Sequence, residues 1–178
     1  PLVVQAFTIL RKKYLPEAEL YLAGPAEADI LAALREKEIV PEEADWQGIH
    51  LLGDVRPEEL SEYYNLCDVF CMPSYFEAYG LVFAEALTYG LPCIGRDKFA
   101  MSEFIEDGCT GRLISGEDAE KLALDLWEVL RDPKYREEVE RRREWYLREY
   151  SWDKVAQRIC SVMEKNERDK DQYRSAGV

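Results

Sequence analysis

The chain has 178 residues, 47% of them hydrophobic, which is enough for one domain with a hydrophobic core and too short for two typical domains. Its formal net charge of -13 at pH 7 argues against nucleic acid and anionic membrane surfaces as partners, because both are bound by basic protein surfaces. No apolar run is long enough to span a membrane, and no charged segment precedes the apolar residues 1–7, so neither a membrane span nor a signal peptide is expected.

Apolar periodicity predicts helices and strands that alternate along the chain. In order, we expect a helix over residues 2–14, a strand over 20–23, a helix over 26–37, a strand over 49–52, a helix over 57–64, a strand over 69–72, a helix over 81–89, a strand over 93–94, a short helix over 101–105, a strand over 111–114, and helices over 119–130, 133–150 and 152–164. Strict alternation is typical of parallel sheets covered by helices on both faces. The predicted fold is therefore α/β, with a Rossmann-like parallel sheet in one domain over residues 1–165 and a polar C-terminal tail over 166–178.

Two acidic residues in the segment 73–87 mark the most informative part of the chain. Gly80 precedes a helical stretch, so Glu77 is expected on the loop that follows a strand and Glu85 on the helix. Open α/β sheets bind their ligands at junctions of this kind. The segment is therefore the candidate functional site.

The residue types at this junction suit a nucleotide sugar. The first N–H groups of a helix and the positive end of its dipole favour an anion, so a phosphate is expected at the Gly80 amides. Glu85 lies roughly 7 Å further along the helix, at about 1.5 Å per residue, so Glu77 and Glu85 can flank that phosphate. Carboxylates accept hydrogen bonds from hydroxyl groups, which would place a sugar at Glu77 and a ribose at Glu85. In the alternative interpretation, both carboxylates only stabilise the helix dipole.

Six motifs, taken in order, resemble those of the C-terminal half of a family 4, GT-B-fold retaining glycosyltransferase. They occupy residues 19–24, 49–55, 73–87, 89–94, 103–114 and 150–152. Several independent motifs that match in order and spacing are far more specific than one short motif. The resemblance reaches to about residue 165 and so covers nearly the whole chain.

The resemblance implies a role for each residue of the site. Glu77, the residue implied in catalysis, would contact the hydroxyl groups of the donor sugar, and Glu85 would bind the ribose of the nucleotide. Backbone groups that would approach the sugar and diphosphate belong to Ala78, Tyr79, Gly80 and Leu81. Residues expected to lie against the base are Gly53, Asp54, Val55 and Arg56.

The resemblance also implies that this chain is the donor-binding half of a larger hexosyltransferase-type enzyme. The first strand of the fold, an N-terminal domain and an upstream Arg and Lys that hold the diphosphate would be absent, so the chain alone is expected to be inactive. The implied partners are a nucleotide-diphosphate sugar and a saccharide or lipid-linked acceptor bound by the absent domain, with no cofactor or metal. A front-face reaction is the usual proposal for such enzymes, and a double displacement through Glu77 stays open.

One loop departs from the family pattern. Relatives often carry a glycine pair where this chain has the residues 98–101, Lys-Phe-Ala-Met, so we expect a reshaped sugar end of the pocket and leave the donor open. The alternative function is a non-catalytic α/β module that binds a nucleotide or another phosphorylated ligand.

Five cysteines without a Cys-x-x-Cys pair argue against a disulfide framework and favour a reducing, cytoplasmic location, with peripheral membrane association of the full-length enzyme left open. Cys71 is expected in the core rather than in a metal site with Cys67, because the chain has a single histidine. That residue, His50, either lines the pocket or lies at a strand edge.

Overall fold

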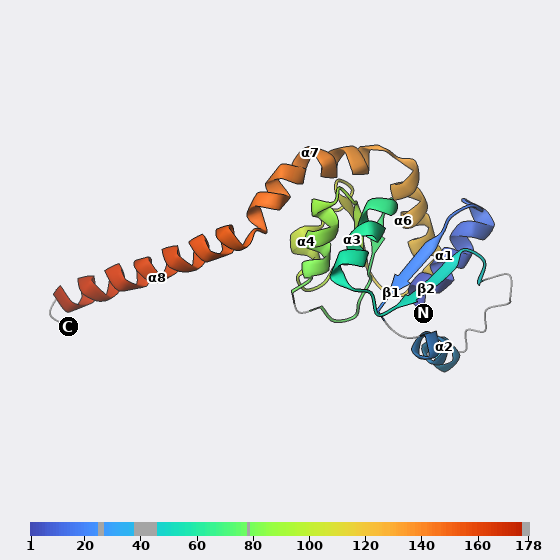
Figure 1. Cartoon of the computed structure of the whole chain (residues 1–178), viewed down its shortest axis with the longest axis horizontal. Helices are drawn as coiled ribbons and strands as arrows, with labels where there is room; N and C mark the ends of the chain where they lie inside the picture. The colour runs from blue at the N-terminus through green and yellow to red at the C-terminus, as the bar shows by residue number, and fades with distance from the viewer. Residues whose placement is uncertain (25–26, 38–45, 78, 176–178) are drawn as a thin grey trace.

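The structure is a computed structural model that describes residues 1–24, 27–37, 46–77 and 79–175. Helices and strands alternate as expected until the last three helices (Figure 1). The elements are α1 Leu2–Lys13, β1 Leu20–Ala23, α2 Glu27–Glu36, β2 Ile49–Gly53, α3 Pro57–Leu66, β3 Phe70–Cys71, α4 Leu81–Thr88, β4 Cys93–Arg96, α5 Met101–Phe104, β5 Gly111–Ile114, α6 Ala119–Arg131, α7 Lys134–Glu149 and α8 Trp152–Ser175.

All paired strands run parallel, which confirms the predicted sheet type. Strands β1 and β2 form one pair, and β3, β4 and β5 form a second sheet with β4 in the centre. In the second sheet Phe70 lies opposite Cys93, and Cys93 opposite Gly111. The single sheet expected from the sequence is therefore divided into two in this structure.

Helices cover both faces of the sheet β3–β5, because consecutive strand residues point to opposite sides. Cys93 packs into a cluster with side chains from α3, α4, α5 and α7, whereas its neighbour Ile94 packs with side chains from α1 and α6. Leu113 and Ile114 of β5 divide between the same two clusters. The expected arrangement of helices on both faces of a parallel sheet is thus confirmed.

The last helix is longer than the sequence interpretation allowed. Helix α8 runs through Ser175, into the segment expected to be a polar tail. Residues 152–175 contain neither proline nor glycine, and polar residues such as Glu, Lys, Arg and Gln are good helix formers, so polarity alone does not end a helix. Figure 1 shows α8 standing away from the rest of the molecule, beyond the end of α7.

The helices of the structure were compared with the requirements for crossing a membrane. In the part of the chain that the structure describes, no helix combines the length and the apolar character needed to cross a membrane.

The packing of α6 against α1 and the sheet can be tested with two leucines of the same helix. Leu122 is fully buried, whereas Leu124 is 43% exposed. Leu122→Ala should lower the free energy of unfolding by about 2–5 kcal/mol, because the side chain leaves a cavity. Leu124→Ala should lower it by less than about 0.5 kcal/mol, since leucine and alanine have similar helix propensities. Urea titrations followed by circular dichroism measure both values, and equal losses would contradict the described packing of α6.

Candidate functional site

The carboxyl ends of β3, β4 and β5 meet at one edge, because the three strands are parallel. The loop after β3 carries Glu77, and the loop after β4 carries the residues 97–100. Ligands of open α/β sheets bind at this edge. The structure thus places the segment chosen from the sequence at the position where a ligand site is expected.

Arg96, at the end of β4, contacts the loops that follow β3 and β5. Its Nε donates to the carbonyl oxygen of Pro73 at 3.0 Å, and its Nη1 donates to the carbonyl oxygen of Gly116 at 2.6 Å. The guanidinium carbon lies 4.2 Å from the centre of the Tyr75 ring, a cation–π contact. Nη2 lies 3.9 Å from a Glu117 carboxylate oxygen and finds no hydrogen-bond acceptor among the described residues.

The Arg96 side chain is a structural part of the site that the sequence interpretation missed. The residue is only 5% exposed, and a buried guanidinium is stable only when carbonyl or carboxylate oxygens receive its N–H groups. An arginine at the end of a buried strand is the one signal that could have indicated this role. Arg96 therefore fixes the start of the loop that carries Glu77.

Glu77 folds back onto the start of α4. Its Oε1 accepts a hydrogen bond from the backbone N–H of Gly80 at 3.1 Å. Gly80 has a φ of 75°, and a Cβ there would meet the Phe83 ring at 3.3 Å, so glycine suits this position. The Gly80 N–H, which the sequence interpretation assigned to a phosphate, is thus engaged by Glu77 in this structure. The alternative interpretation, in which Glu77 stabilises the start of the helix, agrees with this hydrogen bond to the residue that precedes α4.

Glu85 lies exposed on α4 and points to α3. Its Oε2 accepts a hydrogen bond from the phenol of Tyr64 at 3.3 Å. Burial, aided by the charge of Glu85, raises the pKa of the Tyr64 phenol well above its ordinary value, so this group remains a donor. The Tyr64 ring also stacks on Tyr89 with 5.1 Å between centroids. Glu77 therefore lies on the loop before α4 and Glu85 on α4 itself, and the two carboxylates contact different neighbours.

The residues expected at the base lie after β2. Gly53 accepts the N–H of Gly24 at 2.7 Å, and a Cβ at either glycine would meet no atom within 4 Å. Both glycines thus leave their backbone open on one side. Arg56 instead begins α3 and pairs with Glu59. The remaining expected site residues are exposed (Asp54, Tyr79 and Leu81), half-buried (Val55) or outside the described residues (Ala78).

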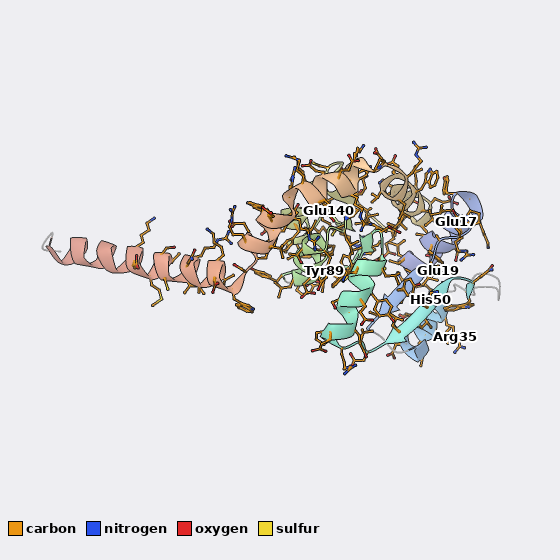
Figure 2. The ribbon with its side chains drawn as sticks, turned by 45° about the horizontal axis from the view of Figure 1, so that its top comes forward. Glu17, Glu19, Arg35, His50, Tyr89 and Glu140 are labelled. Atoms are coloured by element: carbon orange, nitrogen blue, oxygen red, sulfur yellow. The ribbon has the colours of Figure 1, made fainter. Side chains whose placement is uncertain are left out.

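His50 is the second residue of β2, near the amino end of the strand and away from its carboxyl end. Its ring stacks on Tyr21 with centroids 4.6 Å apart. Its Nε2 lies 3.6 Å from a carboxylate oxygen of Glu19, and Figure 2 labels both residues. The side chain is 45% exposed. Of the two interpretations left open for His50, the structure favours a surface strand residue.

The cysteines were considered above as possible disulfide or metal-site residues. All five cysteines are free, Cys71 packs with the α1 and α6 cluster, and burial raises the pKa of the Cys93 thiol. Within the residues described, no group of three or more His, Cys, Asp or Glu side chains is arranged to hold a metal ion.

A shallow hollow of about 600 Å³ lies at the opposite, amino edge of the sheet. Asp68 and Pro92, which precede β3 and β4, contribute to its lining. The Asp68 carboxylate pairs at 3.0 Å with Arg136, which also lines the hollow. The hollow contains none of the expected site residues.

Aromatic side chains are exposed on the loops after β3 and β4. Phe76 and Phe99 are in edge contact, with 5.4 Å between their centroids. Exposed aromatic residues on these loops are Tyr75, Phe76, Tyr79 and Phe99. The loop that departs from the family pattern therefore brings an aromatic ring to the carboxyl edge.

The role of Arg96 can be tested by removing its N–H groups while keeping an unbranched side chain. Arg96→Met leaves the Pro73 and Gly116 carbonyl groups without their donor, so it should lower the free energy of unfolding by about 1–3 kcal/mol. Arg35→Met on the exposed side of α2 is the matched control and should change it by less than about 0.5 kcal/mol. Urea denaturation compares the two, and a neutral Arg96→Met variant would contradict the anchoring role.

Comparison with known proteins shows one family. Residues 1–145 match the family model described as glycosyl transferases group 1. A D-inositol 3-phosphate glycosyltransferase of Corynebacterium urealyticum is 27% identical over 162 residues, which are 90% of this chain and 38% of that protein. A lipopolysaccharide 1,2-N-acetylglucosaminetransferase of Salmonella typhimurium is 30% identical over 122 residues, which are 67% of this chain and 32% of that protein. The chain thus spans less than two-fifths of the length of these curated relatives.

Solved structures share the fold. A pneumococcal O-GlcNAc transferase in complex with UDP and GlcNAc has a TM-score of 0.70 at 23% identity, over 91% of this chain and 33% of that one. Anabaena HepE in complex with UDP has a TM-score of 0.75 at 18% identity, over 92% of this chain and 44% of that one.

Proposed function

The chain belongs to the glycosyl transferases group 1 family, and we propose that it is the donor-binding half of a retaining enzyme that moves a hexose from a nucleotide-diphosphate sugar to an acceptor. The observation that carries this proposal is the position of Glu77, beside the amino end of α4 at the carboxyl edge of a parallel sheet. A carboxylate that accepts hydroxyl groups next to a helix end that attracts anions suits a sugar joined to a phosphate.

Glu77 is proposed to bind the donor sugar. The Gly80 N–H holds its Oε1 and so fixes the direction of the carboxylate, while Oε2 is proposed to accept from sugar hydroxyl groups. The diphosphate would lie against the backbone of Tyr79 and Leu81, near the positive end of the α4 dipole. In this assignment Gly80 orients Glu77 and has no contact with the phosphate through its N–H.

Glu85 is proposed to bind the ribose. The Tyr64 phenol holds Oε2, which leaves Oε1 to accept from a ribose hydroxyl group. The base would lie over the open backbone of Gly24 and Gly53, with residues 54–56 beside it. UDP, present in the two solved relatives described above, is the first nucleotide to test.

The reaction requires charge stabilisation at the diphosphate. Breaking the bond between the sugar and the phosphate places positive charge on the anomeric carbon and negative charge on the leaving phosphate, which the amide groups at the start of α4 would stabilise. We propose a front-face route, in which a leaving phosphate oxygen takes the acceptor proton while the new bond forms on the same face. Glu77 orients the sugar in this route and forms no covalent bond.

The rest of the enzyme is proposed to precede this chain. The two sheets follow the dinucleotide-binding strand order 3-2-1-4-5-6 if one further strand stands between β1 and β3, and a strand upstream of α1 would supply it. The same upstream part would contribute the cations for the diphosphate and the domain for a saccharide or lipid-linked acceptor. The free state of all five cysteines is in keeping with a cytoplasmic location. The proposed reaction uses no cofactor.

The two glutamates should have separable effects in the full-length protein. Glu77→Gln should lower kcat at least about a hundredfold, because an orienting charge is lost, while the affinity for UDP stays within about twofold. Glu85→Gln should weaken UDP binding about tenfold or more, because a charged hydrogen-bond acceptor of the ribose is replaced by a neutral one. Transfer assays and calorimetric titration measure these values.

The exposed Glu62→Gln on α3 serves as the control and should match the wild type in both measurements. Near-normal kinetics and nucleotide affinity for both site variants would refute the assigned roles. Tight nucleotide binding by a wild-type protein that transfers no sugar would instead favour the non-catalytic binding module.

The isolated 178-residue chain should transfer no sugar, because the proposed acceptor site and diphosphate cations lie elsewhere. Transfer assays with the chain alone and with the full-length protein make the comparison. Turnover by the chain at a rate near that of the full-length protein would show that the active site is complete within it.

A further inference from the structure

Two exposed phenylalanines from different loops meet beside Glu77. Phe76, in the loop after β3, is 73% exposed, and Phe99, in the loop after β4, is 52% exposed. Their ring centroids lie 5.4 Å apart, and the rings are inclined by 66°. Single exposed apolar side chains are ordinary on protein surfaces, but an exposed pair in contact at a ligand edge indicates a binding surface.

The backbone of Phe99 is held in an unusual conformation. Its φ is 55°, and among the described residues it is the single residue other than glycine with a positive φ. A bulky side chain enters this region at an energetic cost, and such conformations gather at ligand sites. The cost is not offset by burial of the ring in the core, because half of Phe99 remains exposed. The Phe76 ring is the aromatic neighbour that Phe99 reaches in this conformation.

The surroundings of the pair identify the chemistry of a fitting ligand. Glu77 follows Phe76 directly and provides a carboxylate whose Oε1 is held by Gly80. A pyranose ring has hydroxyl groups around its rim and C–H groups on its faces. The rim suits a carboxylate, and the partly positive C–H groups suit the negative face of an aromatic ring.

A nucleotide base also stacks on aromatic rings, yet it is the less suitable occupant of this position. The open backbone of Gly24 and Gly53, where the base is proposed to lie, belongs to the β1–β2 pair, whereas Phe76 and Phe99 follow β3 and β4. The carboxylate next to the phenylalanines is the one assigned to sugar hydroxyl groups.

We propose that Phe76 and Phe99 form an aromatic subsite that packs against the C–H face of the donor sugar while Glu77 binds its hydroxyl groups. This inference rests on the proposed function and adds the residues that distinguish a nucleotide sugar from a nucleotide alone. The subsite selects donors whose sugar presents an unobstructed C–H face. Free nucleoside diphosphate makes no contact with it.

The test uses calorimetry on the full-length protein with UDP, GDP and ADP and with the glucose, mannose and N-acetylglucosamine conjugates of these nucleotides. The diphosphate and conjugate that bind the wild type most tightly are then compared in each variant. Phe99→Gly and Phe76→Ala should each weaken binding of the conjugate about tenfold while the diphosphate stays within about twofold. Glycine tolerates a φ of 55°, so Phe99→Gly keeps the loop conformation.

Two controls separate the subsite from general damage. Phe76→Tyr keeps an aromatic ring and should retain the conjugate affinity of the wild type. Leu147→Ala, an exposed apolar position on α7, should change neither affinity.

Conjugate binding that is unchanged in both Phe99→Gly and Phe76→Ala would overturn the subsite and leave the proposed function standing. An equal loss of diphosphate and conjugate binding would also overturn it, because it would show a structural role of the loop. A wild-type protein that binds none of the diphosphates would instead refute the proposed function and the subsite with it.

Discussion

The contact that organises the carboxyl edge of the sheet is the buried guanidinium of Arg96. It binds the carbonyl groups of Pro73 and Gly116, so two loops that are distant in the sequence share one cation. The position of Glu77 depends on this contact, because Pro73 lies near the start of the loop that carries Glu77. Tyr75 covers the same guanidinium with its ring and links the loop to it a second time. A site on loops thus gains the rigidity of the strand on which Arg96 stands.

The candidate site is positioned by helices that pack on a small sheet. Alternate strand residues such as Cys93 and Ile94 anchor different layers of helices, which fixes the direction in which each strand ends. Phe83 and neighbouring residues of α4 are buried in the core, which holds the amino end of this helix and Glu77 at the edge of the sheet. The alternation of strand side chains between the two faces of the sheet therefore determines both the packing of the core and the geometry of the site.

The sequence predicted the elements, and with them the elements on which Glu77 and Glu85 lie, because these depend on local patterns. Helix and strand periods placed Glu77 on a loop and Glu85 on a helix, and the structure has both there. The contacts of these residues could not be predicted from a sequence pattern, since the hydrogen bond between Tyr64 and Glu85 joins residues from two helices. The positive φ of Phe99 could not be predicted either, because a bulky side chain normally avoids that region. The extent of α8 was underestimated because polar composition was taken as the end of a helix.

Helix α8 has a physical consequence of its own. Its Trp152, Ile159, Val162 and Met163 side chains are each more than half exposed, so burial contributes little to its stability. A helix whose side chains are mostly exposed, as they are over residues 152–165, is held mainly by its internal hydrogen bonds, and its amide protons should exchange with solvent far faster than those of α6. Slow exchange of the α8 amide protons in a longer protein would therefore show that another surface covers this helix.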